Sequence, residues 1–227
     1  MFALLLRYFT KVDFHQNESL VMIFGVVAAA SMILGNLLAL LQNNVKRLLA
    51  YSSIAHLGYL LVAFLASGAM TVTAVAYYLT AYFVMMLGAF GIVTVLSGRD
   101  WEADALEDYQ GLAWQRPWVA AVFTATLLSL AGIPLTAGFI GKFYVLAAGA
   151  GSRLWWLVFI LVITSSMGLF YYLRVIVVMY RLPSPEIERS PVKLSISLGA
   201  LTLLLVWLGV YPAPFIEFIR TTLASLA

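Results

Sequence analysis

The sequence has no cysteine, only two histidines, and charged side chains at only 10% of its 227 positions. Without cysteine, the chain forms no disulfide and binds no iron–sulfur cluster through thiolates. His15 and His56 lie far apart in the sequence, which argues against a bis-histidine haem. A soluble domain carries about 25% charged residues, so this composition excludes an ordinary soluble protein. No phosphate-binding loop, zinc signature or nucleophile elbow is present, and GFIGK lacks the spacing of a Walker motif.

What the sequence does have is long apolar runs: 63% of its residues are hydrophobic and its mean hydropathy is +0.99. The runs are continuous rather than alternating, which favours helices over barrel strands. Spanning a hydrocarbon core of about 30 Å takes roughly 20 helical residues. We therefore predict an all-α polytopic membrane protein with about six transmembrane helices, at residues 20–42, 45–67, 72–97, 117–150, 154–181 and 193–211. The leading segment 1–9 lacks the features of a cleavable signal peptide and is interpreted as a short interfacial helix or the tail of a preceding span.

The fourth run, 117–150, is longer than one span requires and contains Gly132 and Pro134. Proline removes a helical hydrogen-bond donor and clashes with the preceding turn. We expect a broken helix at Gly132–Pro134. Irregular backbone at membrane depth is tolerated only where it is buried in protein or lines a wet cavity.

Charge is concentrated in the connections between spans. Residues 99–117 hold five carboxylates and are expected to form a solvated loop that can include one helical turn. Residues 181–193 form a polar linker with three prolines. The positive-inside rule places Lys46, Arg47, Arg99, Arg116, Arg181, Arg189 and Lys193 on the cytoplasmic or equivalent side, opposite Lys11, Arg153 and Arg220. The segment 213–227 is weakly amphipathic and is expected to lie along the interface.

The ionisable groups inside the spans are all bases: Lys142, His56 and Arg174, with Lys46 at the start of its helix. All carboxylates fall in loops or near the chain ends. A buried charge usually needs a partner. We therefore expect these bases to bind a partner outside this sequence, to contact water, or to lose their protons.

Lys142 is predicted to be a proton relay, because burial disfavours its ammonium form and the helix break offers a wet environment. The alternative is a lysine that snorkels to the interface. Gly151 lies nine residues further on, roughly 13 Å at helical rise, which is far for a lysine side chain to reach.

The other bases leave two interpretations each. His56, near Ser52, Ser53 and Tyr59, is either a relay through its two ring nitrogens or a neutral histidine bonded to a neighbouring helix. Lys46 is either a positive-inside anchor or the point where protons enter. Arg174 stays charged and is interpreted as a structural ion pair or phospholipid contact. Glycines in the spans are expected to serve close helix packing, and Tyr171 and Tyr172 to serve the interface belt or helix packing.

Three segments carry a family resemblance: NNVKRLLAYSSIAHLGYLL (43–61), SLAGIPLTAGFIGKFYVL (129–146) and LWWLVFILVITSSMGLFYYLRVIVVMY (154–180). They resemble subunit N of bacterial NADH-quinone oxidoreductase, respiratory complex I. The first two motifs are shared by its antiporter-like subunits and the Mrp cation/proton antiporters. The lysine in GFIGK and the LWWL and YYLRV text favour subunit N.

The resemblance implies a proton-pumping subunit of fourteen helices in two inverted repeats, each with one broken helix. The six spans would be helices nine to fourteen, with 1–9 the end of helix eight, so that 1–227 forms a single transmembrane domain from the C-terminal half of a larger subunit. Lys142 matches the lysine of the second broken helix, Lys46 matches the lysine of helix ten on the central polar axis, and His56 lies on that same helix. These three are the expected relay residues.

The resemblance further implies no cofactor in this chain, since NADH, FMN, the iron–sulfur clusters and quinone belong to other subunits. The expected partners are other membrane-arm subunits and the lipid bilayer, without nucleic acid, and the expected location is the bacterial inner (plasma) membrane as a multi-pass protein. The first broken helix with its lysine and glutamate would precede Met1, so the chain is expected to be truncated, split or incomplete, and not to pump alone. The competing interpretations are an Mrp-type antiporter subunit and a non-conducting scaffold.

Overall fold

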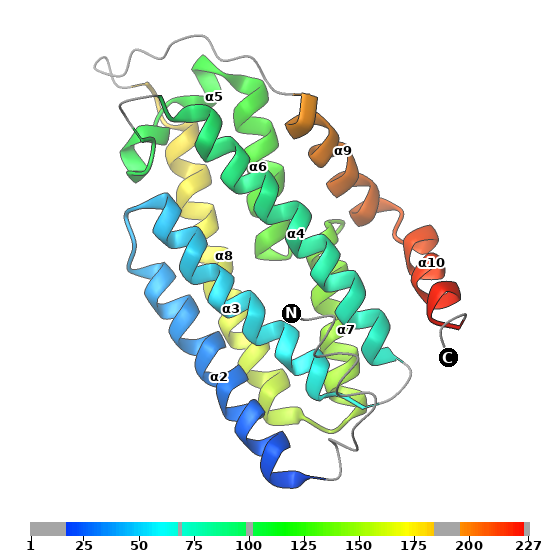
Figure 1. Cartoon of the computed structure of the whole chain (residues 1–227). Coiled ribbons are helices and arrows are strands. Elements are labelled where there is room, and N and C mark those ends of the chain that lie inside the picture. Colours follow the sequence, from blue (N-terminus) through cyan, green and yellow to red (C-terminus); the bar gives the residue numbers. More distant parts are fainter. Residues whose placement is uncertain (1–16, 68–69, 99–101, 184–195, 225–227) are drawn as a thin grey trace.

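The computed structural model describes residues 17–67, 70–98, 102–183 and 196–224, and Figure 1 shows its bundle of helices. Within these ranges the regular elements are helices, and the one β-bridge pairs Asn44 with Ala105. The predicted all-α fold is thus confirmed. The elements are α2 (Glu18–Leu40), α3 (Val45–Leu65), α4 (Met70–Leu96), the 3₁₀ helix η2 (Leu106–Tyr109), α5 (Leu112–Gln115), α6 (Pro117–Ala131), α7 (Ala137–Gly151), α8 (Trp155–Tyr180), α9 (Ile196–Val210) and α10 (Ala213–Ala224).

Four of the helices, α2, α3, α4 and α8, are long and apolar enough to cross a membrane unaided. The fourth predicted span appears as the two shorter apolar helices α6 and α7. The sixth predicted span corresponds to α9, whose expected first residues, 193–195, lie outside the described part of the chain, as does the leading segment 1–9. α10 follows α9 after a short break and is bent 86° from it.

Helix starts follow from local capping chemistry. The Asn17 side chain accepts a hydrogen bond from the Leu20 amide at the start of α2, and the Asn44 side chain accepts one from the Arg47 amide at the start of α3. Pro117 occupies the first turn of α6, where its missing N–H costs nothing. These residues determine where α2, α3 and α6 begin.

The bundle packs small residues inward and leaves large apolar ones outside. On α2 the buried face includes Gly25 and Ala28, while Ile23 and Val26 are more than half exposed. Such a surface suits lipid, because lipid tails are as apolar as the side chains and helices associate through close contact of small residues. α2 packs against α3 and α8, whereas α9 packs against α4, α6 and α7. In Figure 1, α2 and α9 accordingly lie on opposite sides of the bundle.

The acidic loop is packed rather than freely solvated, which differs from the prediction. Tyr109 and Leu112 are fully buried, and the Tyr109 hydroxyl donates to the Ala103 carbonyl at 2.8 Å. The loop also reaches the end of α8, because the Trp114 indole donates to the Tyr180 carbonyl at 3.2 Å. Glu102 and Glu107 are exposed, whereas Asp104 and Asp108 are partly buried, and the side chains of Tyr109 and Leu112 anchor the loop. A count of carboxylates does not reveal this combination.

The two ends of the bundle keep the predicted separation of Lys46, Arg116 and Arg181 from Arg153. The α2–α3 turn, the acidic loop and the end of α8 meet at one end, which holds Lys46, Arg116 and Arg181. At the other end, the Ser67 amide donates to the Ser152 hydroxyl at 2.7 Å, next to Arg153. Four further bases of this prediction lie outside the described residues: Arg99, Arg189, Lys193 and Lys11.

Candidate functional site

The helix break forms at the predicted place, between α6 and α7. Gly132 has φ +84°, a left-handed conformation that glycine adopts without strain. The Gly132 amide donates to the Ser129 carbonyl and the Ile133 amide to the Leu128 carbonyl. This is a Schellman motif, which closes a helix with a left-handed residue. It leaves the carbonyls of Leu130 and Ala131 without partners in the helix backbone.

The chain restarts as a helix within a few residues. Thr136 caps α7: its hydroxyl accepts from the Phe139 amide at 3.3 Å and donates to the Ile133 carbonyl at 2.6 Å. Gly138 then lies so close to α6 that a Cβ there would be 1.8 Å from the Ser129 carbonyl oxygen. The two half-helices therefore overlap at the break, and the next turn of α7 carries Lys142 past the end of α6.

Lys142 binds the carbonyls that the break leaves open. Its Nζ donates to the Leu130 carbonyl at 3.0 Å, to the Ala131 carbonyl at 2.9 Å and to the Ser165 hydroxyl of α8 at 2.9 Å. In its ammonium form the side chain has three N–H donors, and these three acceptors match them one to one. The negative end of the α6 dipole also favours a cation there. Lys142 is 6% exposed, so it does not snorkel to the interface.

A cavity of about 330 Å³ adjoins Lys142, between the break and α8, and it opens at the surface, where Phe143 and Val162 of its lining are 57% and 49% exposed. Its lining includes Gly132, Ile133, Ser165 and Ser166, together with apolar side chains such as Phe143. The volume exceeds the roughly 30 Å³ share of one water in the liquid. The backbone of the break therefore borders a space large enough for water, as expected for irregular backbone at membrane depth.

Tyr59 links Lys142 to His56. The Lys142 Nζ lies 5.4 Å from the centre of the Tyr59 ring, a cation–π distance. The same ring lies 5.5 Å from the His56 ring, centre to centre. The Tyr59 hydroxyl accepts a hydrogen bond from the Asn36 amide of α2 at 2.9 Å, and Tyr171 donates to the Asn36 side-chain oxygen at 3.1 Å. Two of the three predicted relay residues, Lys142 and His56, thus share one buried polar cluster.

His56 is buried, and both of its ring nitrogens have tyrosine partners. Nδ1 lies 2.8 Å from the Tyr78 hydroxyl and Nε2 lies 3.4 Å from the Tyr172 hydroxyl. These tyrosines come from α4 and α8, so the histidine joins three helices. Tyr171 and Tyr172 are each 1% exposed, which selects helix packing over an interface belt. The arrangement suits both predicted interpretations of His56, a hydrogen-bonded neutral ring and a relay with a partner on each nitrogen.

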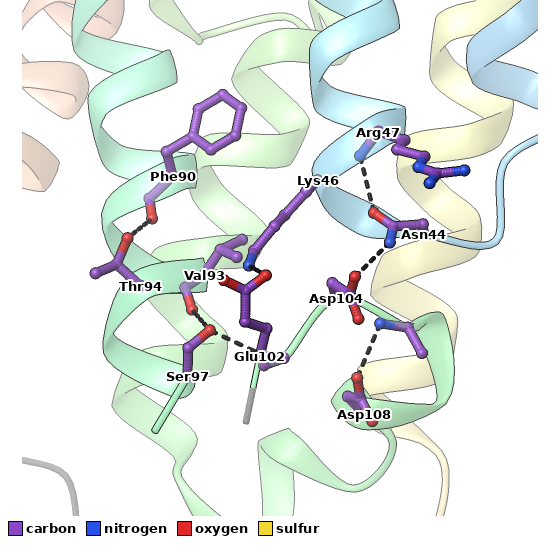
Figure 2. A network of polar contacts seen from close by, with 12 residues as sticks. Asn44, Lys46, Arg47, Phe90, Val93, Thr94, Ser97, Glu102, Asp104 and Asp108 are labelled. Carbon is purple, nitrogen blue, oxygen red and sulfur yellow. Dashed lines mark hydrogen bonds and ion pairs between the residues drawn. The ribbon is translucent and has the colours of Figure 1, made fainter. Parts of the chain in front are cut away.

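Lys46 lies apart from this cluster, at the end of the bundle shown in Figure 2, where it points toward Glu102. The Lys46 Nζ is 2.6 Å from a Glu102 carboxylate oxygen, with the two side chains 30% and 72% exposed. Lys46 precedes His56 by ten residues on α3, about 15 Å at helical rise. Among the described residues, no hydrogen bond or ion pair joins Lys46 to His56 or Lys142.

The acidic loop is held against the start of α3 by backbone pairing, which explains the ion pair. The Val45 amide donates to the Asp104 carbonyl at 2.6 Å and the Leu106 amide to the Asn43 carbonyl at 2.8 Å. The Asn44 amide group adds a bond to the Asp104 carboxylate at 2.6 Å (Figure 2). The expectation that every base in or beside a span lacks a carboxylate in this chain was therefore wrong for Lys46.

Asp108, further along the same loop, is partly buried. Burial raises the pKa of its carboxyl above the usual value, although that carboxylate accepts a hydrogen bond from the Ala105 amide at 2.8 Å. Arg174 on α8 donates to the Gln42 carbonyl, just past the end of α2. Arg174 forms no ion pair among the described residues. Its contact joins α8 to the end of α2 through a backbone carbonyl, in place of the predicted ion pair.

The residues that sequence reasoning missed are the neutral partners. Ser165, Asn36 and Tyr78 bind Lys142, Tyr59 and His56 respectively. One signal was available, since Thr164, Ser165 and Ser166 form a polar triplet inside the apolar run of α8.

Known proteins resemble this chain in sequence and structure. Subunit N of NADH-quinone oxidoreductase from Ectopseudomonas mendocina is 49% identical over 238 residues, covering 100% of this chain and 48% of the relative. Respiratory complex I from Thermus thermophilus with bound Aureothin matches at a TM-score of 0.74 and 30% identity, covering 86% of this chain and 45% of that one. The Mrp complex from Dietzia sp. DQ12-45-1b matches at a TM-score of 0.77 and 21% identity, covering 88% and 46%, which shows the fold alone.

The chain spans about half the length of the curated relatives it matches. A family model described as NADH:quinone oxidoreductase/Mrp antiporter, TM, matches residues 1–168. That match covers well over half of this multi-pass membrane chain and includes both the broken helix and Lys142. The chain belongs to the transmembrane family of NADH:quinone oxidoreductase and Mrp antiporter subunits.

Proposed function

We propose that this chain forms a single transmembrane domain of an N-type subunit of NADH-quinone oxidoreductase, which translocates protons in the membrane arm of the complex. The observation that carries the proposal is the buried Lys142 side chain, whose Nζ binds the Leu130 and Ala131 carbonyls at the break between α6 and α7. The identity to a curated subunit N supports the choice of this complex within the family. The expected setting is the bacterial inner membrane, with other membrane-arm subunits as partners.

Proton transfer would centre on Lys142 and His56. Both lie in one buried cluster, with Tyr59 against each of them. Lys46 would serve at the end of the bundle, where it is accessible to solvent and paired with Glu102. The interval between Lys46 and His56 would need water molecules to carry a proton. NADH, FMN, iron–sulfur clusters and quinone are assigned to other subunits, whose electron transfer drives the transport.

The test replaces Lys142 by arginine in the assembled complex. Arginine keeps a positive charge for the open carbonyls of α6 but does not release its proton in proteins. We expect the Lys142→Arg complex to assemble and oxidise NADH while moving fewer protons per NADH than the wild type. The measurement is proton uptake into proteoliposomes against NADH oxidation.

Lys142→Ala is the companion variant, because it removes both the charge and the hydrogen bonds to the Leu130 and Ala131 carbonyls at the end of α6. A non-conducting scaffold predicts an unchanged proton-to-NADH ratio in Lys142→Arg, and that result would reject the relay. An Mrp-type antiporter predicts sodium-dependent proton exchange and no copurification with a flavin and iron–sulfur arm. That pair of results would move the chain to the other branch of the family.

A further inference from the structure

Ser165 differs in kind from the other two partners of Lys142. The ammonium donates to two backbone carbonyls, of Leu130 and Ala131, and to one hydroxyl, of Ser165. A carbonyl oxygen only accepts hydrogen bonds, whereas a serine hydroxyl both accepts and donates. The three contacts are therefore equivalent while the lysine is charged and become unequal when it loses a proton.

A neutral lysine has two N–H donors and one lone pair. The two donors can stay on the Leu130 and Ala131 carbonyls, which would otherwise be unpaired and buried at the end of α6. The lone pair then needs a donor, and Ser165 supplies the hydroxyl already 2.9 Å from Nζ. Ser165 is thus the partner that can bind both protonation states without a change of position.

Ser165 also faces the space that could hold water. It lines the cavity of about 330 Å³, together with Ser166 and the backbone of Gly132 and Ile133. Ser166 is the neighbouring hydroxyl, but it donates to the Val162 carbonyl of its own helix and makes no bond to Lys142. The chain therefore offers two adjacent serines on one cavity, of which one contacts the lysine.

We propose that Ser165 is the hydroxyl through which Lys142 exchanges its proton with water in this cavity. The inference rests on the proposed relay role of Lys142. An N–H bond of the ammonium breaks and its proton forms a new O–H bond on Ser165, while the original Ser165 proton passes to a water molecule. The nitrogen keeps the electron pair and accepts a hydrogen bond from the regenerated hydroxyl. Reprotonation runs the same steps in reverse.

The test compares Ser165→Val with Ser165→Thr in the assembled complex. The two variants have nearly the same shape and differ in the hydroxyl, and the Ser166→Ala complex is the control on the same cavity. A positioned proton-transfer group contributes about 100-fold or more in rate. Ser165→Val should therefore remove as much proton uptake per NADH as Lys142→Arg does, while Ser165→Thr and Ser166→Ala stay near wild type.

Equal losses in Ser165→Thr and Ser165→Val would show that shape matters rather than the hydroxyl, and would overturn the inference. So would full pumping by Ser165→Val in a complex where Lys142→Arg is impaired, and the proposed function would then survive. Full pumping by Lys142→Arg would instead reject the proposed function itself. If the Ser165→Val complex does not assemble, the smaller Ser165→Ala is used instead. Its proton uptake per NADH should fall to the level of Lys142→Arg while that of Ser166→Ala stays near wild type, and full uptake by Ser165→Ala would overturn the inference.

Discussion

At the scale of residues, Lys142 and the end of α6 satisfy each other. The Schellman motif at Gly132 closes the helix but leaves two carbonyls open in a buried place, and the ammonium binds both. An unpaired charge at membrane depth costs several kcal/mol. Here the carbonyl dipoles and one hydroxyl replace the carboxylate that such a charge usually has. Because these partners are neutral, losing the proton leaves no uncompensated negative charge behind.

Gly132→Ala tests this coupling between backbone and side chain. A non-glycine residue in the left-handed region costs roughly 1–2 kcal/mol. A Cβ at this position would also lie 2.9 Å from the Lys142 Cδ, so the lysine stem must shift. We expect a lower unfolding temperature in detergent and fewer protons moved per NADH. Gly151→Ala, where a Cβ meets nothing within 4 Å, is the control on α7. Equal stability of the two variants would contradict this account.

At the scale of elements, contact between α2 and α3 depends on two glycines that face the opposite helix. A Cβ on Gly35 would lie 2.6 Å from the Ala55 backbone nitrogen, and one on Gly58 would lie 2.8 Å from Met32 Cγ. This close approach places Asn36 of α2 beside Tyr59 of α3. The packing of small residues therefore positions a polar cluster as well as joining two helices.

Gly35→Ala should separate α2 from α3, because the added methyl meets backbone atoms that cannot rotate away. Overpacking of this kind costs about 1–3 kcal/mol. We expect the thermal stability of the purified protein to fall, while Gly199→Ala, whose Cβ would meet nothing within 4 Å, leaves it unchanged or slightly higher. A neutral result for Gly35→Ala would mean that α2 shifts freely against α3.

At the scale of the whole molecule, the acidic loop covers one end of the bundle. It joins the α2–α3 turn through the Asn44–Ala105 bridge and reaches the end of α8 through Trp114. Lys46 and Glu102 form the one ion pair among the described residues. An exposed pair of this kind contributes at most about 1 kcal/mol. The backbone bridge and the hydrogen bonds of Asn44 and Trp114 should therefore hold the loop more firmly than this ion pair does.

Asn44→Ala tests this ranking against Glu102→Gln. Alanine removes the cap of α3 and the bond to Asp104 together, and loss of a cap alone costs about 0.5–2 kcal/mol. Glu102→Gln should cost less, and its effect should shrink at high salt because ions screen exposed charges. Denaturation curves of the two variants at low and high salt give the comparison. A larger loss in Glu102→Gln would reverse the ranking.

Much of this architecture follows from local sequence. Apolar runs of about 20 residues specify membrane-spanning helices, because only a helix satisfies its own backbone in lipid. Gly132 and Pro134 predicted the break, since glycine adopts backbone conformations that end a helix and proline fixes its own φ angle and lacks an N–H donor. Lys142 stood out as a candidate because it is a lone charge in an apolar run.

Only the tertiary structure decided which groups these residues meet. Ser165 lies 23 residues from Lys142 and Glu102 lies 56 from Lys46, in segments that their own patterns do not connect. In a membrane protein both the buried and the lipid-facing sides of a helix are apolar, so hydrophobic periodicity does not fix how one helix rotates against another. The rotation of α8 places Ser165 on Lys142 and Tyr172 on His56, and the packing of the acidic loop places Glu102 on Lys46. Those partners arise from close packing between distant segments, which no local pattern specifies.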